Sequence, residues 1–143
     1  MSYIKCNHGK FLGTFARDKM PLTPKRPCGF IVNTDPSKEK GEHWNAIMLL
    51  PGGKGEFFNS FGFPPLHPTE QKYMRNECPS GFEFSSRTIQ DPLSDRCGLF
   101  CIDYLSSRLN GESFSQFLNH YKNSHSLEEN EQQLEKRIYE KFG

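Results

Sequence analysis

Residues 44–61, with the sequence WNAIMLLPGGKGEFFNSF, contain two short apolar runs separated by a turn-forming segment. The runs 44–50 and 56–61 have the length and the apolar composition of buried strands. Residues 51–55, which contain one proline and three glycines, are typical of a hairpin connection. We therefore predict two adjacent antiparallel strands here, and the apolar run 28–33 predicts another short strand.

The segments on either side of these strands are richer in turn formers. Residues 1–27 are polar and interrupted by glycines and prolines, so we predict loops there. Residues 62–68 also have the composition of a turn, after which Thr69 is placed to cap a short helix that ends near Glu77. Residues 82–89 alternate apolar and polar side chains and predict a further strand.

The strongest helical pattern begins near Arg96. A broad apolar face follows it, and Asn110 and Gly111 provide a C-terminal stop. The apolar face consists of Leu99, Phe100, Ile102, Leu105 and Leu109. This pattern predicts one central helix from about residue 96 to residue 109.

Two capping boxes predict further helices. Ser113 pairs with Gln116, and Ser126 pairs with Glu129 at the start of a helix that runs to Phe142. Helices gathered around a central hairpin indicate an α+β fold. We expect one domain over residues 1–143, with a small, mostly antiparallel sheet packed by helices.

The charge balance restricts the classes of partner. The chain has 143 residues, with 18 basic against 17 acidic side chains and a net charge of +1. Such a balance argues against strong charge-driven binding to nucleic acid or to a membrane. No apolar run approaches the ~18 residues of a membrane span, and no signal-peptide core is present at residue 1. We therefore expect a soluble protein of a reducing compartment that does not bind membranes.

The chain has five cysteines, at positions 6, 28, 78, 97 and 101. Their number is odd, so at least one thiol is free, and no CxxC pair or zinc-finger histidine spacing is present. We therefore expect no structural metal. A zinc site built from Cys97, Cys101 and His43 is an alternative, because the two cysteines lie one helical turn apart. The sequence does not identify the third and fourth ligands that such a site needs.

Cys97 lies at the start of the strongest predicted helix. A thiol in that place faces unpaired backbone N–H groups and the positive end of the helix dipole, which favour the thiolate. Taken alone, Cys97 is as well explained as a buried, unreactive cysteine. A nucleophilic thiol also needs a base, and His43 opens the predicted strand 44–50, which is the first strand of the hairpin.

Two amide side chains complete this candidate site. Asn59 closes the strand that pairs with the strand of His43, so its oxygen can accept a ring N–H and leave the other ring nitrogen toward Cys97. Gln90, with the backbone N–H of Cys97, could form an oxyanion hole. Each residue alone has an ordinary explanation, as a surface histidine, a turn asparagine or an isolated glutamine.

Together these residues resemble the adenovirus protease (adenain) family of cysteine peptidases. The resemblance covers the chain from about residue 9, in the family order and at nearly the family spacing. It rests on the blocks FLGTF (11–15), CGFIVNT (28–34), GEHW (41–44), FNSFGF (58–63), Gln-x6-Cys-Gly-Leu-Phe-Cys (90–101) and NEQQL (130–134). Similar proteases occur in virophages and in Polinton-like or adintovirus-like elements, and the wider clan includes the SUMO-type proteases.

The resemblance implies that Cys97 is the nucleophile at the N-terminus of a central helix. It makes His43 the general base and acid, Asn59 the residue that orients His43, and Gln90 the oxyanion donor. The implied reaction is peptide hydrolysis through a thioester, next to small residues such as Gly-Gly or Gly-x-Gly. The implied role is a viral maturation protease that cleaves capsid and other virion precursor proteins. We expect a monomer in the virion and in the nucleus or cytoplasm of the infected cell, not a secreted protein.

Two features depart from the family pattern. Position 59 is Asn where relatives generally have Glu or Asp, and an amide orients imidazole without offsetting the charge of imidazolium. Adenovirus proteases are activated by DNA and by a peptide that forms a disulfide, and Cys78 lies near the expected position of that disulfide. The near-neutral charge argues against activation by DNA, and the chain is shorter than the adenovirus examples, so segments that contact the activators are expected to be missing. We therefore expect that neither DNA nor a peptide is required.

Two other functions remain open from the sequence. The first is a protease that processes or deconjugates ubiquitin-like proteins, which would also cut after Gly-Gly. Cleavage of a ubiquitin-like fusion at the rate at which a capsid precursor is cleaved would favour this function over virion maturation. The second is an inactive protease-fold scaffold, which would keep every activity after Cys97→Ala.

Overall fold

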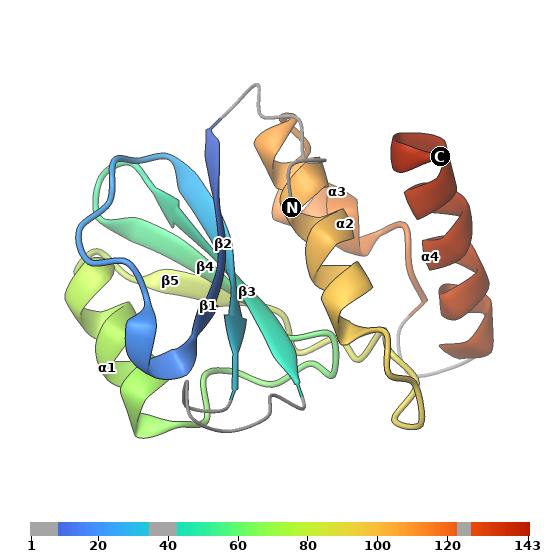
Figure 1. Ribbon diagram of the computed structural model, residues 1–143, viewed down its shortest axis with the longest axis horizontal. Helices are drawn as coiled ribbons and strands as arrows, with labels where there is room; N and C mark the ends of the chain where they lie inside the picture. Colours follow the sequence, from blue (N-terminus) through green and yellow to red (C-terminus); the bar gives the residue numbers. More distant parts are fainter. Residues whose placement is uncertain (1–8, 35–42, 123–126) are drawn as a thin grey trace.

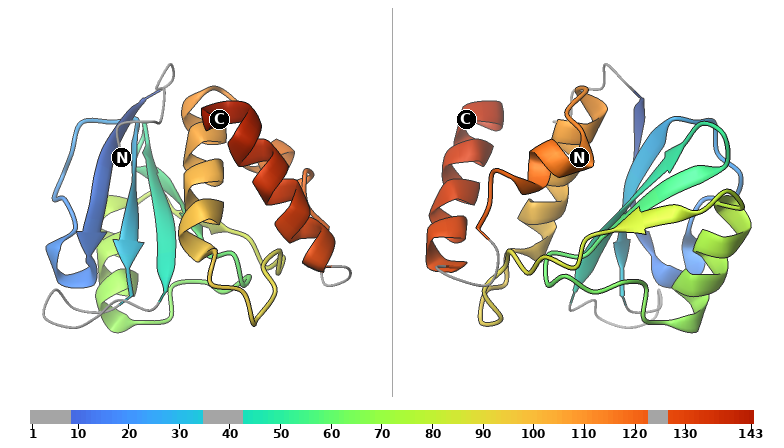
Figure 2. Two further views of the ribbon diagram at one scale, coloured as in Figure 1. Left: turned by 45° about the vertical axis from the view of Figure 1, so that its right-hand side comes forward. Right: turned by 180° about the vertical axis from the view of Figure 1, so that it is seen from behind.

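The computed structural model describes residues 9–34, 43–122 and 127–143, which form a five-stranded sheet with helices on both faces (Figure 1). Strands follow one another across the sheet in chain order, from β1 to β5. Helix α1 covers one face, whereas α2, α3 and α4 lie on the other (Figures 1 and 2). The elements are β1 (Lys10–Ala16), the 3-10 helix η1 (Arg17–Lys19), β2 (Cys28–Asn33), β3 (Trp44–Leu50), β4 (Lys54–Phe58), α1 (Pro68–Glu77), β5 (Phe82–Phe84), α2 (Cys97–Leu109), α3 (Phe114–Leu118) and α4 (Leu127–Phe142).

The inner part of the sheet is antiparallel and its two edges are parallel. Strand β3 pairs antiparallel with β2 and with β4, as the predicted hairpin requires. Strand β1 runs parallel to β2, and β5 runs parallel to β4. The α+β class is confirmed, with a mixed sheet because each edge strand reaches its neighbour through a longer connection than a hairpin.

The prediction of loops throughout residues 1–27 was wrong for β1. This strand is half-buried and pairs with β2 from Lys10↔Cys28 to Ala16↔Asn33. Gly13, at φ 109°, lies where the register shifts between Phe11 and Thr14. The glycine therefore bends the strand instead of ending it, as glycines at bulges do.

Three predicted boundaries differ from the structure. Strand β4 ends at Phe58, so Asn59 is the first residue beyond it. The strand predicted for residues 82–89 is short, ending at Phe84. Helix α1 begins at Pro68, and its cap is His67, whose Nδ1 accepts the N–H of Thr69 at 3.1 Å. Proline suits the first helical position because its missing N–H would have had no partner there.

Alternation along β3 divides the core in two. Ala46 and Met48 belong to the cluster under α2, whereas Ile47 and Leu49 belong to the cluster under α1. Successive side chains of a strand point to opposite faces, so each face receives every second residue. This alternation also decides on which face the residues next to Trp44 lie.

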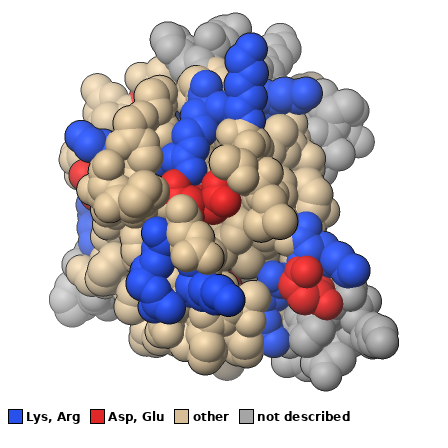
Figure 3. Space-filling view, turned by 90° about the vertical axis from the view of Figure 1, so that its left-hand side faces the viewer, with Lys and Arg blue, Asp and Glu red and all other residues tan. Residues whose placement is uncertain are grey.

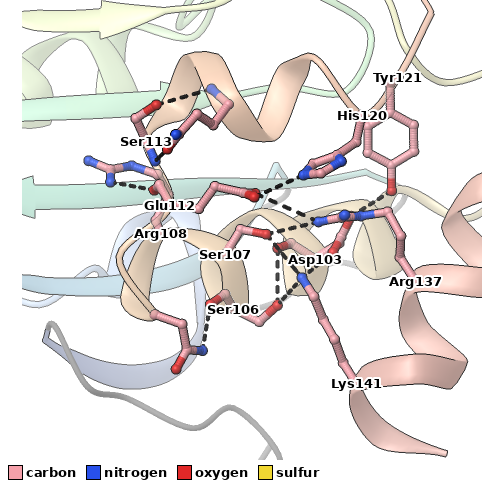
Figure 4. A network of polar contacts seen from close by, with 12 residues as sticks. Asp103, Ser106, Ser107, Arg108, Glu112, Ser113, His120, Tyr121, Arg137 and Lys141 are labelled. Carbon is pink, nitrogen blue, oxygen red and sulfur yellow. Dashed lines mark hydrogen bonds and ion pairs between the residues drawn. The ribbon is translucent and has the colours of Figure 1, made fainter.

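The central helix α2 is held by α3 and α4 on the side away from the sheet. The Ser113–Gln116 capping box of α3 is confirmed, whereas that of Ser126 lies outside the described residues. Asp103 of α2 is fully buried and bonds Arg137 Nε at 2.8 Å and Lys141 Nζ at 2.5 Å, both on α4 (Figure 4). No helix in the described ranges is both long and apolar enough to cross a membrane.

Candidate active site

The first residue of α2, Cys97, lies against the start of β3. Its side chain is buried, with 5% of its surface exposed. One turn later, the thiol of Cys101 donates to the carbonyl of Trp44 at 3.4 Å. A Cβ added to Gly98 would lie 3.8 Å from Cδ1 of Trp44, so helix and strand are in close contact here. The packing of α2 on β3 thus brings Cys97 to the residue that follows His43.

The surroundings of Cys97 act on its thiol in opposite directions. Burial raises the pKa of Cys97, and the charge of Asp95 adds to this. Backbone hydrogen bonds from Trp44, Gly98 and Cys97 itself lower the pKa, because they stabilise the thiolate. Helix α2 has no side-chain cap and no acidic residue in its first turn, so its N-terminal N–H groups remain unpaired by side chains. Burial outweighs these donors, and formation of the thiolate therefore requires a base.

His43 is held by Asn59 and Phe61, which lie just beyond β4. Pairing of β3 with β4 ends at Ala46↔Phe58, and the chain then turns, with the N–H of Gly62 donating to the carbonyl of Asn59 at 2.9 Å. The His43 ring stacks on Phe61 with centroids 4.9 Å apart. Its Nε2 lies 3.2 Å from Oδ1 of Asn59.

The backbone of Phe61 determines which nitrogen of His43 has the proton. The N–H of Phe61 donates to Oδ1 of Asn59 at 2.8 Å, which identifies the atom facing His43 as the amide oxygen. An oxygen acceptor requires Nε2 of His43 to be the donor, so Nδ1 is left with a free lone pair. Burial lowers the pKa of His43, and the side chains of Asn59, which accepts from Nε2–H, and of Asn45 partly offset this. The ring is accordingly neutral at neutral pH and has one basic nitrogen.

The structure brings the predicted pair of His43 and Asn59 together and places Cys97 beside Trp44. No hydrogen bond between Cys97 Sγ and the His43 ring is present among the described residues. Catalytic hydrogen bonds are often long in a free enzyme and shorten only when substrate binds. The proximity of the two groups therefore follows from the contact between α2 and the backbone of Trp44.

Gln90 is fully buried and its side chain is oriented by two contacts. Its Oε1 accepts the hydroxyl of Ser60, and its Nε2 donates to the carbonyl of Ser94 at 2.9 Å. The amide N–H groups thus face the turn that leads into Cys97. One of the two N–H bonds is not used by Ser94, and an oxyanion donor at this site needs such a group.

Two cavities flank the start of β3. The first, of about 560 Å³, lies over the α2 face and is lined by Trp44, Gly98, Leu99 and Ile102 among others. The second, of about 360 Å³, lies on the α1 face. It is lined by Arg17, His43, Asn45, Asn59, His67 and Glu70 among others. His43 therefore lines the second cavity, on the face of the sheet away from α2.

Sequence reasoning missed three contributors to this site: Asn45, Phe61 and Glu70. A polar residue inside the apolar run 44–50 was a usable signal for Asn45, whereas Phe61 lies in the turn beyond β4, outside the paired register. Glu70 comes from α1, and nothing in its local sequence connects it to His43.

Two further cysteine assignments concern metal and activator binding. No group of three or more potential metal-binding His, Cys, Asp or Glu residues occurs among the described residues, Cys97 and Cys101 included. Cys78 is buried at the end of α1, in the cluster on the α1 face. A disulfide from Cys78 to an activating peptide would require this thiol to become exposed.

The chain is similar to viral proteases in sequence and in fold. It is 34% identical over 116 residues to the protease of Bovine adenovirus 2, covering 70% of this chain and 55% of that protein. It is 31% identical over 114 residues to the protease of Porcine adenovirus A serotype 3, covering 68% and 55%. The chain thus spans about half the length of the curated relatives it matches. No family model matches it.

A solved structure supports the fold. The crystal structure of the ASFV pS273R protease superimposes with a TM-score of 0.56 at 21% identity, over 80% of this chain and 43% of that one. At this identity the likeness concerns the fold alone, namely the mixed sheet with helices on both faces.

Proposed function

Because this chain is an adenain-like chain, homologous to the adenovirus proteases, we propose that it is a cysteine endopeptidase with Cys97 as its nucleophile. One observation supports this assignment above the others. The Asn59 oxygen, fixed by the N–H of Phe61, holds His43 with Nδ1 unprotonated just before β3, whose first residue, Trp44, contacts Cys97 at the start of α2. A neutral base held beside a thiol at a helix N-terminus is the arrangement that cysteine peptidases need.

The proposed reaction proceeds in two halves. His43 accepts the Cys97 proton, and the thiolate attacks the carbonyl carbon of the peptide bond. The negative oxygen of the tetrahedral intermediate is stabilised by Nε2 of Gln90 and the backbone N–H of Cys97. The C–N bond then breaks, His43 protonates the departing amine, and a thioester on Cys97 remains.

Water completes the second half. His43 removes a proton from the water as it attacks the thioester, and the C–S bond breaks to release the acid and regenerate the thiol. Asn59 is the positioning residue for His43 throughout, since its oxygen accepts a hydrogen bond from Nε2–H whether the imidazole ring is neutral or charged.

We propose that the substrates are virion precursor proteins, cleaved next to small residues such as glycine. Gly98 follows Cys97 and lines a cavity with Trp44, so the backbone next to the candidate nucleophile can be approached closely by a substrate backbone. The relatives are adenovirus proteases, which favours action in the virion or the infected cell.

We also propose that neither DNA nor an activating peptide is required. The net charge of +1 offers little long-range attraction for DNA. On the face that α1 covers, Lys and Arg side chains are interrupted by acidic ones (Figure 3). Cys78 is too deeply buried to form a disulfide with a peptide without local opening.

The test compares wild-type protein with Cys97→Ala and with Cys78→Ala, a matched loss of another buried thiol. Peptides with Leu-x-Gly-Gly and Leu-x-Gly-x-Gly sites are incubated with and without DNA at low salt, beside a ubiquitin-like fusion. We expect cleavage by the wild type and Cys78→Ala, none by Cys97→Ala, and no gain from DNA.

Each other outcome rejects a stated part of the proposal. A several-fold rise with DNA would reject independence from DNA. Cleavage of the ubiquitin-like fusion as fast as a capsid precursor would indicate the deconjugating alternative. Equal activity of Cys97→Ala and wild type would reject the cysteine mechanism.

A further inference from the structure

A buried carboxylate lies on the face of the sheet that α1 covers and has no role in the reaction proposed above. Glu70, in the first turn of α1, has 4% of its surface exposed. It lines the same 360 Å³ cavity as His43, Asn45 and Asn59. The loop before α1 and the first turn of that helix thus bring an acidic group to the side of the candidate base.

Two oxygen atoms in this cavity are left without partners. Oε2 of Glu70 and Oδ1 of Asn45 are buried and accept no hydrogen bond from the described residues. Leaving a buried polar atom unpaired costs roughly 1–3 kcal/mol, so native proteins rarely tolerate two such atoms together without a reason. An acceptor that gains its partner only during a reaction is one such reason.

Asn45 lies between His43 and Glu70. It is two residues from His43 along β3 and therefore points to the same face of the sheet, where α1 packs. Hydrogen bonding by Asn45 raises the pKa of His43 and lowers that of Glu70. Asn45 thus influences the charge state of both groups, and its oxygen has no donor among the described residues while the His43 ring is neutral.

We propose that Glu70 is a positioning residue for His43, and that it supplies, across the cavity that both residues line, the negative charge that the neutral Asn59 lacks. This inference rests on the proposed cysteine peptidase function. Whenever His43 takes up a proton, the Glu70 carboxylate lowers the free energy of the charged ring.

The other charged and titratable groups at this cavity are compatible with that role. Burial raises the pKa of Glu70, and hydrogen bonding by Asn45 and the charge of Arg17, which also lines the cavity, offset this only in part. His67, before α1, uses its Nδ1 to cap that helix. Glu70 is therefore the acidic residue that lines this cavity together with His43 among the described lining residues.

The test is Glu70→Gln, which removes the charge and keeps the shape. We expect the ring pKa of His43, followed by NMR, to fall by about half to one unit, as loss of a nearby opposite charge requires. We expect kcat to fall about three- to tenfold with KM nearly unchanged. Glu83→Gln, an exposed change on β5, is the matched control and leaves both values at the wild-type level.

A folded Glu70→Gln protein with an unchanged His43 pKa would overturn the proposal. If that variant does not fold, NMR titration of the wild type decides, because Glu70 and His43 must then titrate with mutual shifts. Independent titration of the two groups would also overturn it. Failure of the proposed function would be seen differently, as a wild-type protein without Cys97-dependent cleavage. Such a protein can still show a change in the pKa of His43 on Glu70→Gln.

Discussion

Oδ1 of Asn59 lies 3.2 Å from Nε2 of His43 and also accepts the backbone N–H of Phe61 at 2.8 Å. One amide oxygen thus joins the orientation of the ring to the backbone just beyond β4. The amide can orient the imidazole, but it has no charge with which to stabilise the imidazolium. This relationship determines how the site should respond to substitution.

Asn59→Asp should raise the pKa of His43 by about one unit, because a carboxylate stabilises the charged ring. His43 acts as a base only when neutral, so the acidic limb of the kcat/KM profile should move to higher pH. Asn59→Ala should instead lower kcat/KM about tenfold by releasing the ring. The pH profile of cleavage measures both effects, and an acidic limb that stays in place in Asn59→Asp would contradict this account.

Gln90→Ala should lower kcat by about 10²- to 10³-fold, as loss of an oxyanion donor does. Cys97 alkylation by iodoacetamide serves as the control, because it requires the thiolate and no oxyanion donor. Circular dichroism checks that loss of the contacts to Ser60 and Ser94 has not unfolded the protein. Wild-type kcat in a folded Gln90→Ala protein would remove Gln90 from the mechanism.

Iodoacetamide should modify Cys97 several-fold faster than Cys28, Cys78 or Cys101 at neutral pH. Burial raises the pKa of all four thiols, but only that of Cys97 is also lowered by backbone donors. His43→Ala should slow the reaction of Cys97, because the group that accepts its proton is lost. Peptide mass spectrometry after short labelling measures each rate, and equal rates in the native protein would show that Cys97 is not activated.

Asp103→Asn should lower the free energy of unfolding by about 3 kcal/mol, because it leaves Arg137 and Lys141 without their buried partner. Glu135→Gln, which breaks an exposed pair with Arg96, should change it by less than about 0.5 kcal/mol. Denaturant unfolding compares the two variants. Equal losses would show that the buried network does not hold α4.

Acid should lower the free energy of unfolding of the wild-type protein through protonation of Asp103. The ion pairs hold the pKa of Asp103 below its ordinary value of 3.8, so its contribution is present above pH 3.8. That contribution is lost as the pH falls through the depressed pKa. The stability of Asp103→Asn should consequently vary less with pH in this range than that of the wild type.

Local sequence was sufficient wherever local interactions decide structure. The apolar runs and glycine-rich turn of residues 44–61 predicted the hairpin, and the apolar face after Arg96 predicted α2. Cys97 could be recognised because its helix start is a local feature, and pairing across the hairpin predicted the contact between His43 and Asn59. In each case the relevant residues are close in the chain or are related by strand register.

Tertiary structure decided the rest. Residues 10–16 are apolar at Phe11, Leu12, Phe15 and Ala16 but are interrupted by a glycine, and they form β1 where β2 offers a parallel partner. The contact between α2 and Trp44 brings Cys97 to the hairpin, and the packing of α1 brings Glu70 to Asn45 and His43. These contacts depend on how buried faces fit together across long stretches of chain, and no local pattern of polar and apolar residues specifies that fit.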